Sequence, residues 1–481
     1  MTLHTHPAAP RISAAHAAIA LGLVLLSACS TPTRHALPST PALPAQWQQP
    51  TAGSKALSAQ AWWLALGDDT LSTLIDEALA RNRDVARSVL RLRQAGLNTR
   101  RGEQDQWPQP SVGLSAGAQR PLHDTGPSSV LINGVNVPLP TSTGTSTSAG
   151  MSLSASYELD LWGRVADSVA LADHNARASA ADLDTARWLL STQVAEQYWA
   201  IAAADAKRPL LTAQITDAQA SLVEARLRLD QGKARAAEVD RAQANLADAQ
   251  LRLLALDTQR GTAQRTLALL MDVPPQQYTP PTARLPAASP AELPAGTPTD
   301  VLDRRPDLRS ARHALEAALL KLNIAEANRY PAIRLSTTLG SGGNGLGQWL
   351  ANPVASLGAA LALPMVDWER TRIDRNLAQL QLDDAAIAFR DSLYKALAEV
   401  DNLLAQWQQV QSDLTNVRDK LLQADKALAV ARLRHATGVD ALQTVRDADQ
   451  AQREAQSALI DLRVKAWQNQ VALHKALGGP L

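Results

Sequence analysis

The chain has 481 residues with 47 basic and 46 acidic side chains, and its net charge of +1 suggests no basic face for nucleic acid. Aromatic residues make up 4% of the chain, with a single Phe, which argues against the compact core of a typical enzyme domain. The only cysteine is Cys29, and this excludes an internal disulfide.

The first segment of the chain reads as an export signal, predicted over residues 1–28. Its apolar run, Ala14 to Leu26, is too short to span a membrane and suits the hydrophobic region of a signal peptide. The run leads into Ser27-Ala28-Cys29, where a bacterial lipoprotein carries its acylated cysteine; an incidental thiol behind an ordinary signal is the alternative. Residues 29–67, rich in Pro, Ala, Ser and Thr, are then a lipid-anchored tether.

The rest of the chain contains one pattern twice. Sliding the sequence along itself pairs Trp162 with Trp368, and a second alignment pairs Pro108 with Pro331. The two alignments differ because the first copy has a longer loop between Pro108 and Trp162. This is the signature of an internal duplication with one variable loop.

The duplication divides the mature chain. We predict a first repeat over residues 68–272 and a second repeat over residues 300–478. The proline-rich linker between them, residues 273–299, cannot continue a helix. Residues 479–481 form a short C-terminal tail.

In each repeat the hydrophobic period changes from that of a helix to that of a strand. Strands are predicted at about 109–120, 147–162, 332–340 and 353–364. Between Met151 and Leu161, apolar residues alternate with serines and with two carboxylates, Glu158 and Asp160. This alternation fits a barrel strand that faces lipid on one side and water on the other, with a soluble hairpin as the alternative.

Aromatic residues stand at the four junctions between helices and strands: Trp107, Trp162, Tyr330 and Trp368. All four junctions lie on the same side of the predicted sheet, where an interfacial girdle belongs. Four strands cannot close a barrel, and lipid does not tolerate an open edge, so further copies must complete it. Two copies would give a barrel filled by side chains, whereas three would give a channel, which we favour.

A long helical hairpin follows each pair of strands. The first long helix, Gly163 to Asp230, would be ~100 Å long if it were straight, so it should pack lengthwise against other helices. The two hairpins reverse at Gly232 and Gly438, because glycine permits the left-handed turn that ends a helix.

Three motifs carry a resemblance to a known family. They are Tyr157-Glu158-Leu159-Asp160-Leu161-Trp162-Gly163-Arg164, Arg304-Arg305-Pro306-Asp307-Leu308, and Thr437-Gly438-Val439-Asp440. Together they resemble the outer-membrane factors of the TolC/OprM type, close to the lipoprotein branch, over nearly the whole mature chain. The resemblance implies a homotrimer whose twelve-stranded barrel lies in the bacterial outer membrane and continues as a long α-helical barrel in the periplasm. It also implies docking to a periplasmic adaptor and an inner-membrane pump.

The resemblance further implies roles for the hairpin tips, which contact the adaptor in that family. The matching positions are Arg226, Leu227, Gly232, Arg432, Leu433, Gly438 and Val439. It places Asp447 in a carboxylate ring at the closed pore, an ordinary solvated helix residue being the alternative. The neighbouring constriction position, often apolar in the family, is Gln443 here. Asp440 and Glu238 are candidates for hydrogen bonds or ion pairs at the tips.

The expected fold is mainly α with a membrane β-barrel portion, and the expected function is passive efflux of small molecules driven by the inner-membrane pump. The expected covalent group is a lipid on Cys29, without cofactor or metal. A lipid-anchored coiled-coil surface protein of structural or adhesive function is the alternative; strands placed between helices favour the duct. Gly113-Leu114-Ser115-Ala116-Gly117 matches a nucleophile elbow, but no helix follows it, so we do not expect an enzyme.

Overall fold

The computed structural model describes residues 33–39, 42–49, 61–120, 122, 129–132, 135–138, 145–286, 290–291, 293–343 and 352–479. The predicted signal peptide and Cys29 lie outside these ranges. The chain divides into two compact units. The sheet unit comprises Met1–Pro38, Ala95–Asn175 and Leu315–Ala385, and the hairpin unit comprises Ser39–Gln94, Ala176–Ala314 and Ala386–Leu481.

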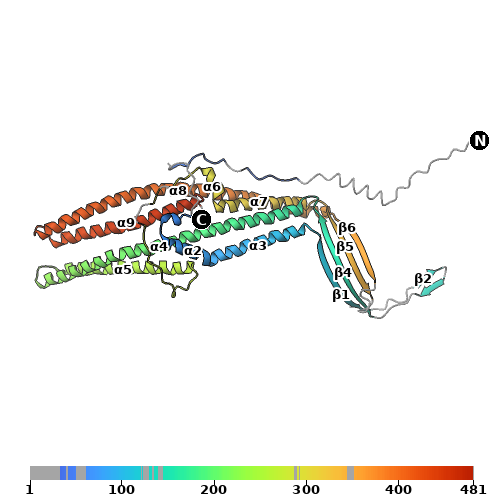
Figure 1. Ribbon diagram of the computed structural model, residues 1–481, viewed down its shortest axis with the longest axis horizontal. Helices are drawn as coiled ribbons and strands as arrows, with labels where there is room; N and C mark the ends of the chain where they lie inside the picture. Colours follow the sequence, from blue (N-terminus) through green and yellow to red (C-terminus); the bar gives the residue numbers. More distant parts are fainter. Residues whose placement is uncertain are drawn as a thin grey trace, which may run out of the picture. The chain divides into compact units, whose positions relative to one another are not determined.

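Helices dominate both repeats (Figure 1). In the first repeat they are η1 (Leu64–Leu66), α2 (Asp69–Arg81), α3 (Arg83–Asp105), α4 (Arg164–Asp230) and α5 (Ala236–Leu270). In the second they are α6 (Pro298–Arg304), α7 (Pro306–Ala327), η3 (Pro364–Asp367), α8 (Trp368–Ala436) and α9 (Leu442–Ala476). Helix α5 runs back along α4, and α9 runs back along α8, so each repeat ends in an antiparallel hairpin.

The sheet unit contains one four-stranded antiparallel sheet, in the order β1-β4-β5-β6. Its strands are β1 (Gln109–Gln119), β4 (Ser146–Leu159), β5 (Ala332–Gly343) and β6 (Pro353–Ala362). Pairing of β4 with β5 joins the two repeats, with Glu158 opposite Arg334. Strands β1 and β6 are therefore the open edges of the sheet.

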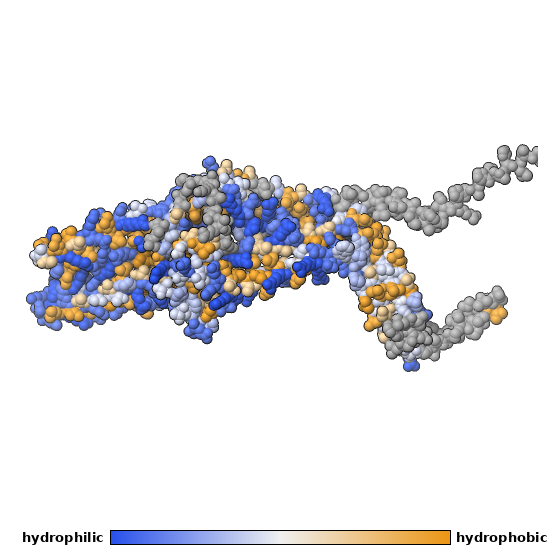
Figure 2. All heavy atoms as spheres, in the orientation of Figure 1, coloured by the Kyte–Doolittle hydropathy of each residue, from blue (hydrophilic) through white to orange (hydrophobic). Residues whose placement is uncertain are grey.

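The register gives the sheet one apolar face. The pairs Val112–Leu153 and Leu153–Leu339 belong to a single row across β1, β4 and β5. These side chains are exposed, as are Leu114 at 76% and Leu357 at 85%. Figure 2 shows apolar residues gathered over the strands. An exposed apolar face of this extent needs a cover that the described chain does not supply.

A second sheet lies within the segment expected to be a loop between the first two strands. It consists of β2 (Ser129–Ile132) paired antiparallel with β3 (Val135–Pro138). Asn133-Gly134 separates the two strands in the sequence, and Asn-Gly is a strong signal for a two-residue hairpin.

Helix α4 contains Pro209 in its interior. The continuous helix predicted for this segment therefore runs through a proline. Proline has no N–H to donate to the carbonyl of Asp205. Ion pairs to α5 flank this position: Arg260 Nε bonds Asp205 Oδ1 at 2.6 Å, and Arg208 Nη2 bonds Asp257 Oδ2 at 3.3 Å. These contacts hold the two helices together around the missing backbone bond.

Tryptophan residues form the centre of the core in the hairpin unit. Trp62 stacks on Trp188 at 6.4 Å, and Trp199 lies 6.4 Å from Trp467. Trp62 Nε1 donates to Ser191 Oγ at 3.3 Å. These large side chains bring the segment before α2 onto α4 and α9, so a single cluster spans residues distant in sequence.

The turn between α6 and α7 is held by a buried arginine. The side chain of Arg305 is 6% exposed and forms ion pairs at 2.7 Å with Asp307 and with Glu399 of α8. Its Nη1 also donates to the carbonyl of Ala476, at the end of α9, at 3.2 Å. One guanidinium thus joins three helices. None of the helices in the described ranges has the length and apolar character to cross a membrane.

Candidate functional site

The two hairpin tips have the same backbone geometry. Gly232 and Gly438 have φ of +69° and +74°, in the left-handed region. After the first, Lys233 N donates to Arg228 O at 2.8 Å; after the second, Val439 N donates to Arg434 O at 2.9 Å. This bond pattern satisfies the last carbonyls of α4 and α8, and the positive φ explains why glycine stands at both positions.

The side chains of the two tips differ. At the second tip, Arg434 holds Asp440 with two bonds of 2.8 and 3.0 Å, and this lowers the pKa of the Asp440 carboxyl. His435 Nδ1 lies 2.9 Å from the Asp440 carbonyl oxygen. At the first tip, Glu238 Oε1 accepts from the backbone N–H of Arg235 at 3.3 Å, next to the start of α5. The second tip is therefore the more extensively bonded of the two.

Apolar side chains project from both tips. Leu227, Leu433 and Val439 are 56%, 67% and 63% exposed. Arg226 is also exposed, whereas Arg432 pairs with Asp449 of α9 at 3.1 Å. Exposed leucines beside arginines form a surface suited to binding another protein.

The two residues predicted at the pore lie on one face of α9. Gln443 Nε2 donates to Asp447 Oδ1 at 2.7 Å, one helical turn away. Both side chains are exposed in the single chain. The described chain thus pairs them with each other, and their place in a ring stays a prediction.

Ion pairs between α4 and α9 connect the two hairpins. Arg446 Nη1 lies 2.7 Å from Glu224 Oε2, and Arg453 pairs with Asp217. Glu224 and Asp217 are seven residues apart on α4, as are Arg446 and Arg453 on α9. Two antiparallel helices with this spacing present the opposite charges to each other along one seam. Neither contact was predicted from the sequence, because charged residues are frequent on every long helix and their spacing alone does not pair them.

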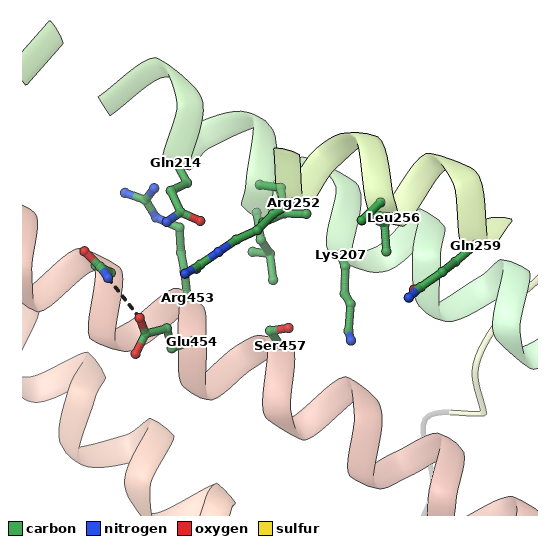
Figure 3. Close-up of a pocket in the computed structure, with 12 residues that line it drawn as sticks. Lys207, Gln214, Arg252, Leu256, Gln259, Arg453, Glu454 and Ser457 are labelled. Atoms are coloured by element: carbon green, nitrogen blue, oxygen red, sulfur yellow. Dashed lines mark hydrogen bonds between the residues drawn. The ribbon is translucent and has the colours of Figure 1, made fainter. Parts of the chain in front are cut away.

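A groove of about 290 Å³ lies between α4, α5 and α9 (Figure 3). Lys207 of α4 pairs with Asp461 of α9 at 2.5 Å. Arg252 extends into the groove from α5, and Arg453 extends into it from α9. Four apolar residues also line it: Leu210, Leu211, Ala255 and Leu256. The mixture of cations, amides and aliphatic groups is that of a helix–helix seam.

The four aromatic residues at the helix–strand junctions fall into two classes. Trp162 and Tyr330 lie 5.0 Å apart, and Trp162 Nε1 donates to the carbonyl of Pro331 at 2.7 Å. Trp107 and Trp368 are 67% and 55% exposed. Trp162 and Tyr330 therefore pack together where strands meet helices, whereas the rings of Trp107 and Trp368 are exposed.

The start of α4 is fixed by one carboxylate, that of Asp160. Asp160 accepts from the backbone N–H groups of Val165 at 3.1 Å and Ala166 at 2.8 Å. A carboxylate at this position satisfies free N–H groups and complements the positive end of the helix. Gly163, at φ +78°, makes the turn from β4 into the helix. The signal in the sequence was the Asp-Leu-Trp-Gly-Arg segment.

The predicted tether contacts each unit. In the sheet unit, Arg34 lies 3.6 Å from Asp167. Burial raises the pKa of the Asp167 carboxyl, and this arginine offsets only part of the rise. His35 N donates to Asn323 Oδ1 at 3.2 Å. In the hairpin unit, Trp47 Nε1 donates to the carbonyl of Gly296 at 3.1 Å. In the described ranges, the tether thus lies along the surface.

The family described as "Outer membrane efflux protein" matches residues 74–272 and 297–479.

Individual proteins are similar along nearly their whole length. The pyoverdine export outer membrane protein OpmQ of Pseudomonas putida is 32% identical over 462 residues, which cover 95% of this chain and 96% of OpmQ. The outer-membrane channel OprN is similar in structure with a TM-score of 0.78 and 24% identity, covering 94% of this chain and 99% of that one. The CmeC outer membrane channel of Campylobacter jejuni has a TM-score of 0.81 at 21% identity, covering 94% and 95%.

Proposed function

Because this chain belongs to the outer membrane efflux protein family, and is therefore an efflux channel of the bacterial outer membrane, we propose that three copies assemble into one continuous duct. The resemblance seen in the sequence motifs is thereby confirmed. In the proposed trimer the three sheets form a twelve-stranded barrel in the membrane, and the hairpins form a helical barrel in the periplasm. Small molecules pass through it passively.

The sheet carries this proposal. One of its faces is apolar and exposed, and its edge strands β1 and β6 have no partner among the described residues. In lipid, each backbone N–H or C=O group without a hydrogen bond lowers the stability by roughly several kcal/mol. An open sheet edge is therefore not stable there. Joining β6 of one copy to β1 of the next removes every edge. Three copies give a barrel with room for a channel, whereas two give one that side chains fill.

The tips support docking to a periplasmic adaptor. Leu227, Leu433 and Val439 are exposed on turns whose backbone is fixed by Gly232 and Gly438. An adaptor that covers these side chains would bury apolar area at a preformed surface. An inner-membrane pump then supplies the driving force and selects the cargo.

The lipid that we propose on Cys29 would lie at the same membrane. Arg34 is fixed to Asp167 near the start of α4, and five residues of extended chain span at most ~18 Å. An acyl chain on Cys29 would thus enter lipid close to the turn that contains Trp162. The lipid and the barrel together hold the protein in the outer membrane.

Asp447 and Gln443 are the proposed periplasmic gate. Three-fold symmetry would bring three Asp447 carboxylates together, and like charges that share a narrow opening repel one another and attract cations. The exposed position of Asp447, with Gln443 bonded to it, is compatible with a polar ring. Asp440 and Glu238 hold the tips that carry this ring.

Electrical recording tests the duct. The full-length purified protein is reconstituted in planar lipid bilayers, and its mass in detergent is measured by light scattering. The proposed duct predicts a trimer and discrete single-channel currents. The same recordings are made on the double variant Glu224→Gln/Arg446→Gln, in which the hairpins are less tightly joined. A monomer, or a trimer without current in either background, would contradict the proposal and favour a lipid-anchored rod.

A further inference from the structure

The polar face of the sheet is almost uniform. In one row across all four strands, Ser111 pairs with Ser154, Ser154 with Thr338, and Thr338 with Ser356. The hydroxyl groups of Ser154 and Thr338 lie 3.2 Å apart. Glycine occupies other positions of this face, and a methyl group at Gly113 would approach Ser152 Oγ to 2.9 Å. The surface is therefore smooth, hydroxylated and uncharged over most of its length.

One ion pair interrupts this surface at the end nearest the helices. Glu158 and Arg334 face each other in the register of β4 and β5 and are the only charged residues of the four strands that form this sheet. Arg334 Nη2 lies 3.3 Å from Glu158 Oε2, and Arg164 Nη2 lies 2.7 Å from Glu158 Oε1. Two guanidinium groups thus share one carboxylate.

The exposed charge of this cluster is positive. The side chain of Arg334 is 65% exposed, whereas that of Glu158 is 17% exposed because both arginines cover it. A cavity of about 280 Å³ beside the cluster is lined by both arginines and by one further carboxylate, that of Asp105 at the end of α3. Two cations, Arg164 and Arg334, lie within ion-pair distance of one anion, Glu158.

We propose that Arg334 is an anion-binding group on the wall of the duct, which attracts carboxylate or other anionic groups of solutes passing from the helices into the barrel. This inference rests on the proposed three-copy duct, in which the polar face of the sheet lines the lumen. Three Arg334–Glu158 pairs then lie at one level of a wall whose remaining strand residues are uncharged. The attraction acts within a Debye length, about 8 Å at physiological ionic strength, so it is felt by solutes near the wall.

Ion selectivity measures this role directly. Reversal potentials are recorded across a KCl gradient for the full-length trimer, both in the native background and with Glu224→Gln/Arg446→Gln. Arg334→Gln should raise the permeability ratio of potassium to chloride by about twofold or more, since it leaves Glu158 and Asp105 less compensated. Glu158→Gln should shift the ratio in the opposite direction. Arg334→Lys keeps the charge and should stay near the native value.

A matched control separates position from charge. Arg87 pairs with Asp84 at 3.3 Å and is 66% exposed, so Arg87→Gln removes an equally exposed arginine that lies on α3 and not on the sheet. Its permeability ratio should match the native protein. If the channels conduct and Arg334→Gln and Glu158→Gln behave as Arg87→Gln does, the role of Arg334 is refuted and the duct stands. If neither background conducts, the duct is refuted and this inference with it.

Discussion

Arg446 of α9 and Glu224 of α4 form an ion pair of 2.7 Å that joins the two helical hairpins of the chain. The Arg446 side chain is 19% exposed and that of Glu224 is 42% exposed, so water screens the pair only in part. In the proposed duct, any widening of the periplasmic end that separates the two hairpins has to break this contact.

Arg446→Gln should therefore favour opening. A partly exposed pair of this kind contributes about 0.2–1 kcal/mol, which corresponds to an increase of up to about fivefold in open probability. Single-channel recording at low and high salt measures the open probability. The native channel should open more at high salt, because salt screens the ion pair. Glu224→Gln added to Arg446→Gln should have little further effect, because the pair is already lost. Fully additive effects of the two substitutions would show that they do not act through their contact.

Asp447→Ala tests the gate itself. Removing three carboxylates from the proposed ring should raise the basal conductance or weaken the preference for cations. Planar bilayer recording of the reconstituted trimer measures both quantities. Asp391→Ala is a control for charge alone, because Asp391 lies on α8 and pairs with Lys395 one helical turn away. Conductance and selectivity that stay unchanged in Asp447→Ala would remove this residue from the gate.

His474 should make the hairpin unit sensitive to acid. Its ring is 6% exposed, its Nε2 is buried without a partner, and burial lowers its pKa to about 4. The unfolded chain takes up this proton near pH 6.5, so stability is full above that pH and is lost as the pH falls toward 4. The free energy of unfolding should fall by about 3 kcal/mol, because the pKa of His474 differs between the unfolded and the folded chain and each pKa unit corresponds to about 1.4 kcal/mol.

Urea unfolding between pH 7 and pH 4.5 measures the effect of His474. The variant His474→Gln cannot take up the proton and should lose less stability across this range than the native protein. Trp188 and Gly479 pack on the ring, so the variant starts from a lower stability at pH 7, and the comparison is between the two slopes. Parallel slopes would exclude His474 as the titrating group.

Arg305→Ala should be strongly destabilising. The substitution leaves Asp307, Glu399 and the carbonyl of Ala476 without their shared cation, and breaking a buried pair costs about 3–5 kcal/mol. The neighbouring Arg304 is exposed, so Arg304→Ala should cost less than about 0.5 kcal/mol. Chemical unfolding measures the free energy of unfolding of the two variants. An equal decrease in both would show that the Arg305 network adds no stability.

Local patterns in the sequence determined the elements of this protein. The alternation around Met151–Leu161 predicts a strand with one apolar and one polar face, because successive side chains of a strand point to opposite sides. Gly232 and Gly438 mark the hairpin tips, because a left-handed residue is nearly free of cost for glycine alone. Both inferences depend only on neighbours along the chain.

Contacts between distant residues were decided by the tertiary structure. The partner of Glu158 is Arg334 because β4 and β5 pair in one register, and a shift of one residue would turn Arg334 to the other face. Likewise Arg446 meets Glu224, and Arg305 meets Glu399, only because the helices pack at one axial position. Charged residues are frequent on every helix, and their spacing along the chain does not determine which of them come together. That choice follows from the packing of apolar side chains, which fixes how far each helix is displaced along its neighbour.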